Sequence, residues 1–265
     1  MISRTEAVTA LRAHAETLSL LGVDHLPLPL RARTPPVAPA PAPTDKSNET
    51  AHQPRNNTTS AKSQDSARDT NQCRLDELRA RHDRECPHCT SVKHHNNTVF
   101  GEGDPAARLM FVGEAPGAEE DKTGRPFVGR AGQLLDKMIS AMGLRREDVY
   151  IANVLKARPP NNATPTPDEA AKCGAYLREQ IAIINPQAIV CLGLPATHYL
   201  LDTKASLSSM RGRWHEFQPL PDSSPIPVMP TFHPAFLLRQ YTDENRRKVW
   251  SDLQKAMERI SPEAR

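Results

Sequence analysis

Short apolar runs alternate with longer amphipathic stretches through most of the chain after residue 100. Four runs rich in Val, Ile, Leu and Met predict buried strands: Leu109 to Val112, Val149 to Val154, Ala188 to Leu192 and Val228 to Phe232. Pro230 indicates that the last of these is short or irregular, because proline cannot donate to a strand ladder. Continuous apolar runs of this length are typical of parallel strands covered on both faces.

Helical periodicity fills the intervals between these runs. Residues 133–142 place Leu and Met side chains on one face, and Gly143 follows as a stop signal. Thr166-Pro167-Asp168-Glu169 has the order of an N-cap, a first-turn proline and a capping-box glutamate. Further helices are predicted at about 195–201 and 243–260. The alternation predicts an α/β protein, a three-layer α/β/α fold around a central, mostly parallel four-stranded sheet.

The first 72 residues have a different character. Residues 5–22 carry Val, Leu and Ala at helical spacing, so a segment over 1–30 is predicted to contain an amphipathic helix. Residues 31–72 contain no aromatic residue and six prolines, and cannot bury enough apolar surface to offset chain entropy. They are interpreted as a disordered linker, with a partner-docking arm as the alternative, and 73–265 as the folded domain.

Composition narrows the class of protein. The formal net charge of +3 over 265 residues permits a local basic face without proving nucleic-acid binding. The sequence offers no signal peptide and no apolar run long enough for a membrane span, which favours a cytoplasmic location. Two of the five cysteines form Cys86-Pro87-His88-Cys89, a spacing that in a cytoplasmic protein suggests metal binding or redox chemistry.

The candidate chemistry gathers where the predicted strands end. A glycine turn, Gly113 to Gly117, follows the first strand, and Phe127 comes ten residues later. Asn153 lies at the end of the second strand, and His233 follows the fourth. An aromatic plate, a side-chain amide and a histidine are the groups needed to hold a flat heterocycle and stabilise charge on it. Ligands of open α/β sheets bind beyond the carboxyl ends of the strands.

From about Cys86 to Ile260 the chain resembles a family-four uracil-DNA glycosylase, the bacterial and archaeal iron–sulfur type. Five segments in the family's order carry the resemblance: Gly113-Glu114-Ala115-Pro116-Gly117, Gly124-Arg125-Pro126-Phe127-Val128-Gly129-Arg130-Ala131-Gly132, Tyr150-Ile151-Ala152-Asn153-Val154, Arg158-Pro159-Pro160-Asn161 and His233-Pro234-Ala235-Phe236-Leu237-Leu238-Arg239. It implies a monomer that hydrolyses the N-glycosidic bond of uracil flipped out of single- or double-stranded DNA, which initiates base excision repair.

The resemblance also implies roles for individual residues. His233 would donate a hydrogen bond to uracil O2, Asn153 would bind the N3–O4 edge, and Phe127 would stack on the base. Related glycosylases carry a water-activating carboxylate at the position of Ala115, so Glu114 or Glu120 would position the water here. The predicted uracil-binding residues are Gly113, Glu114, Ala115, Phe127, Asn153 and His233.

Each of these residues also has an ordinary structural interpretation. A histidine before proline is often a turn residue, an asparagine can cap a strand, and a phenylalanine can belong to the core. For DNA contact, Phe236, Leu237 and Leu238 are candidates for an apolar wedge, although Leu237 and Leu238 could instead start a packed helix. The predicted contacts to phosphates come from basic residues: Lys156, Arg158, Arg211, Arg213 and Arg239.

The cysteines depart from the family pattern at one position. The resemblance implies a 4Fe–4S cluster held by four cysteines, of which Cys86, Cys89 and Cys173 are present, but the fourth position is Ala157. The open alternatives are a cluster with another fourth ligand, a labile three-iron form, zinc held by three cysteines and His88 or another histidine, or no metal. Cys73 could swing in, whereas Cys191 is interpreted as a strand-core residue.

Two rival functions remain open from the sequence. Relatives that trap the sugar covalently carry a basic loop with a nucleophilic histidine after the Asn153 region, and Asn161-Asn162-Ala163-Thr164 offers none. A non-catalytic uracil- or DNA-binding module is the second rival, and the presence of His233, Asn153 and Phe127 argues against it.

Overall fold

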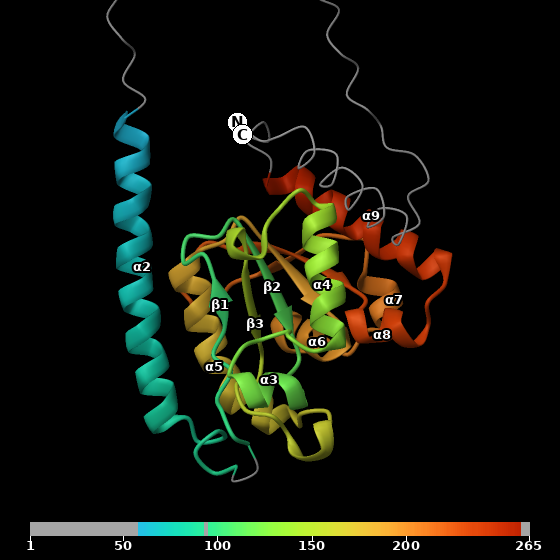
Figure 1. Cartoon of the computed structure of the whole chain (residues 1–265), viewed down its shortest axis with the longest axis horizontal. Helices are drawn as coiled ribbons and strands as arrows, with labels where there is room; N and C mark the ends of the chain where they lie inside the picture. Colours follow the sequence, from blue (N-terminus) through green and yellow to red (C-terminus); the bar gives the residue numbers. More distant parts are fainter. Residues whose placement is uncertain (1–57, 93–94, 261–265) are drawn as a thin grey trace, which may run out of the picture.

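The computed structural model describes residues 58–92 and 95–260. Within this part of the chain the strands are β1 (Glu102–Gly103), β2 (Leu109–Gly113), β3 (Tyr150–Asn153), β4 (Ala188–Leu192), β5 (His215–Phe217) and β6 (Ile226–Thr231). The α-helices are α2 (Thr58–Glu85), α3 (Ala118–Thr123), α4 (Arg130–Ala141), α5 (Pro167–Ile184), α6 (Leu194–Leu201), α7 (Leu207–Met210), α8 (Pro234–Arg239) and α9 (Asp243–Ile260) (Figure 1).

The strands form one mixed sheet in the order β1-β3-β2-β4-β6-β5. Its four central strands, β3, β2, β4 and β6, are parallel and are the four strands predicted from the sequence. The two short edge strands, β1 and β5, are antiparallel, and the sequence did not predict them because strands of two and three residues leave no periodic signal. Pro230 lies inside β6 beyond the register of β5, so its missing N–H costs no ladder bond on that side.

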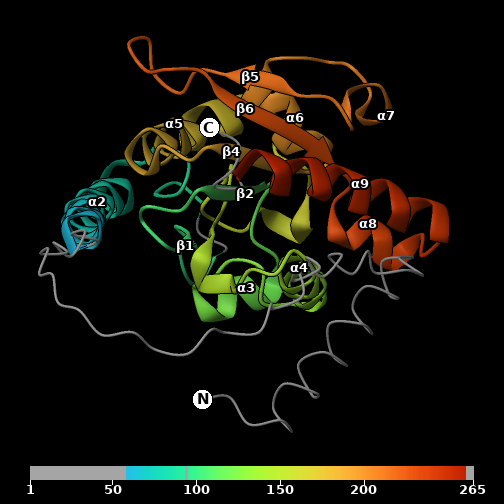
Figure 2. The same cartoon turned by 90° about the horizontal axis from the view of Figure 1, so that it is seen from above.

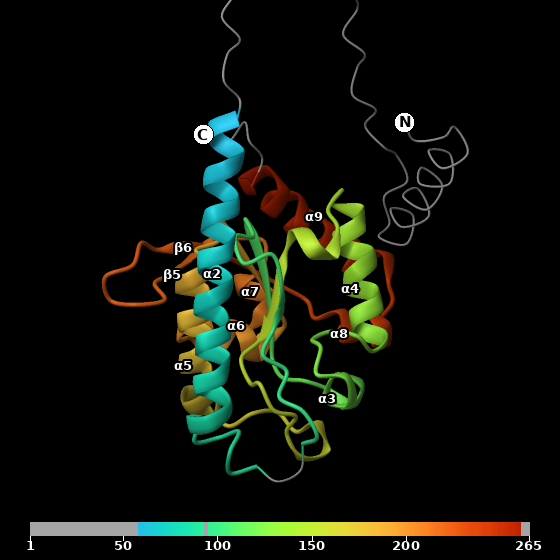
Figure 3. The same ribbon diagram turned by 60° about the vertical axis from the view of Figure 1, so that its left-hand side comes forward.

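Helices cover both faces of the sheet, which confirms the predicted α/β class (Figures 2 and 3). Successive strand residues point to opposite faces. Phe111 and Val190 therefore pack with α4, α8 and α9, whereas Met110 and Val112 pack with α2, α5 and α6. Both clusters are fully buried at the strands, so the carboxyl edge of the sheet is held between two rigid layers.

The predicted helices at the centre of the chain are present. The Thr166 hydroxyl caps α5 by accepting a hydrogen bond from the Glu169 N–H. The Glu169 carboxylate accepts a hydrogen bond from the Thr166 N–H, as the capping-box pattern indicates. The helix predicted over 243–260 is α9. The helix expected at residues 5–22 lies outside the described residues.

Helix α2 changes the predicted organisation. It begins at Thr58, inside the segment interpreted as a linker, so that interpretation is wrong for residues 58–72. Its apolar face is short: Leu75 and Leu78 are buried, and His82 continues the stripe one turn later. This stripe packs α2 along α5, with the two helices side by side in Figures 1 and 3. The remaining surface of α2 is polar and charged, which is why its composition resembled a linker.

Candidate active site and metal centre

A pocket of about 320 Å³ opens at the carboxyl edge of the parallel strands. The turn after β2, the end of β3 and the loop between β6 and α8 all reach it. The residues that line it include all the predicted uracil-binding residues except Gly113: Glu114, Ala115, Phe127, Asn153 and His233. Gly113 lies beneath them, at the last position of β2. The structure therefore brings the predicted site together from segments far apart in the sequence.

Asn153 is the most buried polar side chain that lines the pocket. It is 2% exposed, and its Oδ1 atom is buried without a hydrogen bond to any residue that the structure describes. An unsatisfied buried acceptor costs about 1–3 kcal/mol. A side-chain amide that borders a pocket and is left unpaired in this way is suited to a ligand that offers a matching donor.

Gly113 makes room for the Asn153 amide and the Phe127 ring. A Cβ atom on Gly113 would lie 2.4 Å from Asn153 Oδ1 and 2.5 Å from Phe127 Cζ, far inside van der Waals contact. The first glycine of the motif is thus required by close packing of the two groups that face the pocket.

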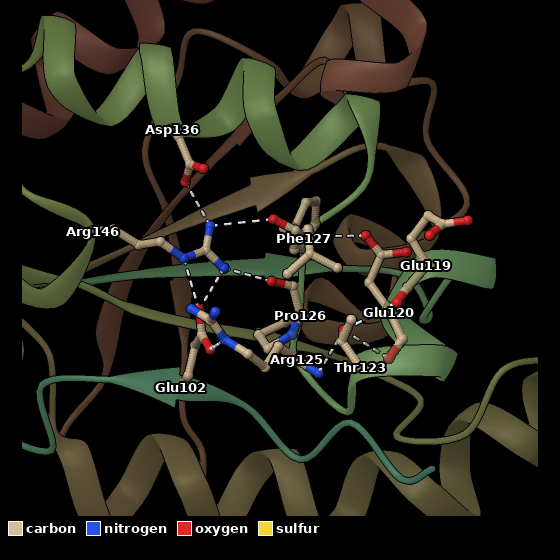
Figure 4. A network of polar contacts seen from close by, with 10 residues as sticks. Glu102, Glu119, Glu120, Thr123, Arg125, Pro126, Phe127, Asp136 and Arg146 are labelled. Carbon is tan, nitrogen blue, oxygen red and sulfur yellow. Dashed lines mark hydrogen bonds and ion pairs between the residues drawn. The ribbon is translucent and has the colours of Figure 1, made fainter. Parts of the chain in front are cut away.

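Phe127 is held in a conformation that phenylalanine rarely adopts. Its φ angle is +51°, in the left-handed region, and its side chain is 5% exposed. The Arg146 guanidinium donates to the backbone oxygens of Phe127 and Pro126, and itself forms ion pairs with Glu102 and Asp136 (Figure 4). The ring lies 5.6 Å from the His233 ring, centroid to centroid, so the aromatic plate is fixed beside the histidine.

Glu120 is an anchor for the loops around the pocket. Its Oε1 atom accepts from the N–H groups of Val128 and Gly129, each at 2.9 Å, and its Oε2 atom accepts from Gly117 N at 3.1 Å. Both carboxylate oxygens therefore accept hydrogen bonds from the backbone. These bonds make Glu120 a positioning residue for the loops; it also lines the pocket, and its catalytic role stays a prediction.

Glu114 remains the carboxylate that faces the pocket without such commitments to the backbone. It is half-buried, and burial raises its pKa above the ordinary glutamate value, an effect opposed by a hydrogen bond with Thr164. Its backbone oxygen accepts from Leu155 N at 3.0 Å, which ties the glycine turn to the chain after β3.

His233 caps α8, and this fixes its tautomer. Its Nδ1 atom accepts from Ala235 N at 3.0 Å, so the proton of the neutral ring is on Nε2. Burial, and then the nearby Arg239, lower the pKa of His233 to about 4, with Glu120 opposing the shift. At neutral pH the pocket therefore holds a neutral imidazole that has one N–H donor available.

Comparison with known proteins identifies the family to which this chain belongs. Residues 100–254 match the model of the uracil DNA glycosylase superfamily. The chain is 50% identical to the type-4 uracil-DNA glycosylase of Thermotoga maritima over 181 residues, 68% of this chain and 92% of the relative. The type-4 uracil-DNA glycosylase of Archaeoglobus fulgidus is 45% identical over 64% of this chain and 85% of its own length. The chain belongs to the type-4 uracil-DNA glycosylase family.

In this type-4 family member the structure also gathers a metal-binding cluster. His82, Cys86, Cys89 and Cys173 are buried, and their ligand atoms all lie within 4.8 Å of one another. The three cysteines are those expected from the resemblance, and such a cluster can hold a metal and is compatible with an iron–sulfur centre. Ala157 is buried in the same cluster and offers no ligand atom.

The fourth member, His82, was not among the predicted ligands by number. His88, the histidine named from the sequence, is buried but lies outside the group. Cys73 is exposed, and Cys191 is buried in β4, as interpreted. The signal that could have identified His82 is its spacing, since residues four apart share one face of a helix and His82 precedes Cys86 by four.

The predicted DNA contacts divide into exposed and buried groups. Arg213 and Arg239 are exposed, and Arg239 borders the pocket. Arg158 is partly exposed and donates to Asn162 Oδ1 at 2.8 Å. Phe236 is partly buried and packs against Phe232, with ring centroids 4.7 Å apart.

Two of the predicted DNA contacts, Lys156 and Leu237, are wrong because these residues are buried, whereas Arg211 is partly exposed and its DNA contact stays a prediction. Lys156 is fully buried, and Leu237 is 1% exposed because it packs in the core under α8. The Arg211 side chain is 15% exposed and forms a bidentate ion pair with Asp252. The helix interpretation weighed for Leu237 is the correct one. None of the helices within 58–92 and 95–260 has the length and apolar character that crossing a bilayer requires.

Proposed function

We propose that this chain is a uracil-DNA glycosylase that hydrolyses the bond between uracil N1 and the deoxyribose C1′. The observation that carries the proposal is the buried, unpaired Oδ1 of Asn153 in a pocket that also holds the Phe127 ring and the His233 imidazole. The family's type-4 members named above carry this activity in their names.

Base selection follows from the hydrogen-bonding pattern of the Asn153 amide. Its Oδ1 atom accepts from uracil N3–H, and its Nδ2 group donates to O4. Cytosine presents an acceptor at N3 and donors at the exocyclic amine, so it would leave both buried groups mismatched. Sites that depend on paired hydrogen bonds discriminate by factors of about 10⁴–10⁵.

Bond cleavage needs stabilisation of the charge that develops on the departing base. The N1–C1′ electron pair leaves with uracil, and negative charge spreads to O2. The neutral His233 donates its Nε2–H to O2, because Nδ1 is already occupied as an acceptor. A preorganised donor at such a position contributes about 3–4 kcal/mol to the transition state. Water then adds its oxygen to C1′ and gives up a proton, and the products are free uracil and an abasic site.

We assign the positioning of that water to Glu114. It lines the pocket, and its carboxylate is the one not used to hold the backbone. A carboxylate at this place also offsets the positive charge that develops on the sugar. Ala115 can do neither.

For DNA binding we propose contacts from Arg239, Arg158 and Arg213, with Leu238 as the apolar wedge. Leu238 is 37% exposed, on the turn of α8 between pocket-lining Ala235 and Arg239. Extrusion of the base leaves a gap in the stack, which a wedge fills. We also propose that the protein acts as a monomer on single- and double-stranded DNA. The cytoplasmic location stays a prediction.

The test is release of uracil from a labelled oligonucleotide, with uracil opposite guanine, opposite adenine and in a single strand. Alkali cleavage at the abasic site and free uracil in solution are expected from the parent chain. A His233→Ala variant should retain binding and lose about a hundredfold or more in rate. A DNA adduct that survives denaturation would support the covalently trapping relative instead. Binding without release by the parent chain would support a non-catalytic module.

A further inference from the structure

The donor atoms of the metal-binding cluster are close enough to surround one ion. His82 Nε2 lies 3.2 Å from Cys89 Sγ and 3.9 Å from Cys173 Sγ, and the two sulfur atoms are 3.5 Å apart. With metal–sulfur bonds of about 2.3 Å and metal–nitrogen bonds of about 2.0 Å, tetrahedral geometry places neighbouring donors about 3.5–3.8 Å apart. The observed separations lie around these values.

We propose that His82 is the fourth ligand of this site, and that the chain binds a single tetrahedral zinc ion with a Cys₃His set. The chain supplies three thiolates here, whereas a 4Fe–4S cluster normally takes four. A cubic cluster also pushes its ligands apart, because four irons and four sulfides stand between them. Donor atoms within 4.8 Å of one another fit one ion better than a cluster.

The surroundings of His82 are those of a metal-bound histidine. Its second ring nitrogen, Nδ1, lies 2.8 Å from Asp83 Oδ1, and the Asp83 carboxylate is itself held by the Thr98 hydroxyl at 2.9 Å. A carboxylate on the outer nitrogen fixes the tautomer and ring orientation of a metal-ligating histidine. Here it leaves Nε2 with a lone pair directed toward the sulfur atoms. Tyr176 packs edge-on against the ring, 4.9 Å between centroids, which holds its plane.

The fold explains how a histidine supplies the ligand in place of the cysteine that the resemblance expects at Ala157. Ala157 occupies the position where the resemblance expects a cysteine, and it packs against Cys86, Cys89 and Cys173. Helix α2 presents His82 one helical turn before Cys86. A histidine reaching from α2 thus takes the coordination position that the Ala157 side chain cannot fill.

His88 provides a matched control. Like His82 it is a buried histidine beside the Cys86–Cys89 pair, at 4% against 0% exposed. Its Nδ1 atom, however, lies 3.9 Å from Glu169 Oε1, and it is not part of the four-residue group. Replacing it removes the same ring without removing a proposed ligand.

The experiment is metal analysis of the full chain, grown with both iron and zinc and purified without oxygen so that a labile cluster would survive. X-ray absorption at the zinc edge counts sulfur and nitrogen ligands on the same sample. We expect about one zinc per chain with three sulfur ligands and one nitrogen ligand. Loss of an outer-shell partner of a metal ligand weakens metal binding by about 10- to 100-fold. His82→Ala should weaken zinc binding by more than this, whereas His88→Ala should leave zinc binding unchanged.

His82→Cys covers the case in which His82→Ala does not fold. It should keep the metal and change the ligand count to four sulfurs. About four irons per chain, with the broad visible absorption of an iron–sulfur cluster, would overturn the zinc assignment. Unchanged zinc affinity in His82→Ala, or an unchanged nitrogen ligand in His82→Cys, would overturn the role of His82. None of these readouts requires uracil release.

Discussion

The ammonium group of Lys156 donates a hydrogen bond to the backbone oxygen of Asn153 over 2.9 Å. The same ammonium donates to Gln180 Oε1, and the Lys156 backbone N–H donates to Cys173 Sγ at 3.2 Å. One fully buried residue therefore connects the metal-binding cluster to Asn153, which we propose binds the base. Burial lowers the pKa of Lys156 to about 8, while the neighbouring thiolates oppose that shift.

Lys156→Met should reduce both stability and base recognition. Methionine fills the space but leaves the backbone oxygen of Asn153 and the Oε1 atom of Gln180 without the Lys156 donor. Each unsatisfied group costs about 1–3 kcal/mol. Urea unfolding should show this loss, and uracil release should slow because Asn153 is no longer held. Lys122→Met is the control, since Lys122 is exposed and, among the residues that the structure describes, its ammonium group forms an ion pair only with Glu119. Equal effects of the two variants would argue that Lys156 has no particular structural role.

Gly113→Ala should reduce uracil release strongly while reducing the stability of the fold much less. The added methyl group would displace the Asn153 amide or the Phe127 ring, both of which face the pocket. We expect a fall in the rate of uracil release of at least a hundredfold. Gly129→Ala provides the control at a nearby loop, where a Cβ would lie 3.4 Å from Glu120 Oε1 and meet no backbone. A fully active Gly113→Ala variant would contradict the packing described for the pocket.

The pH profile should reflect the depressed pKa of His233. Because the neutral ring is the donor, kcat should stay level as pH falls through 6.5 and decrease only toward about pH 4. The folded state binds this proton more weakly than the unfolded chain, so stability should decline as pH falls from about 6.5 to about 4.

Substitution separates this effect from other acid-sensitive groups. His233→Gln should remove that part of the pH dependence of stability. Glu114→Gln tests the second group, whose pKa is raised by burial. A break in kcat near pH 6.5 that disappears in His233→Gln would show that the ring titrates normally and would exclude the neutral-donor mechanism.

Substitution of Arg211 should lower the stability of the fold, whereas substitution of Arg239 should weaken DNA binding. Arg211→Met leaves the buried Asp252 carboxylate without its ion-pair partner. We expect the free energy of unfolding to fall by about 3–5 kcal/mol. The salt dependence of DNA binding should not change. Arg239→Met should change stability by less than about 0.5 kcal/mol and reduce the slope of log affinity against log salt by about 1. The reverse pattern would place Arg211 on the DNA.

Much of the pocket could be predicted from the sequence because its parts follow strands. Gly113 and Asn153 end β2 and β3, and His233 lies two residues after the end of β6. Parallel strands bring their carboxyl ends to one edge, so apolar runs with known order place these residues together. The same reasoning could not place Lys156 or Arg211. Both are cations of a kind that is exposed in most settings, but here Lys156 is fully buried against Gln180 of α5, and Arg211 is partly buried against Asp252 of α9.

The sequence by itself determined the α/β class and the four central strands, because local periodicity and turn chemistry encode them, and its resemblance to the family implied the groups around the pocket. Tertiary structure decided the fourth metal-binding residue. His82 and Cys173 are 91 positions apart, and only the packing of α2 along α5 brings Nε2 and Sγ to 3.9 Å. That packing depends on a short stripe formed by Leu75, Leu78 and His82 in an otherwise charged helix. Such a stripe carries too little periodic signal to identify the helix, its partner or the ligand it supplies.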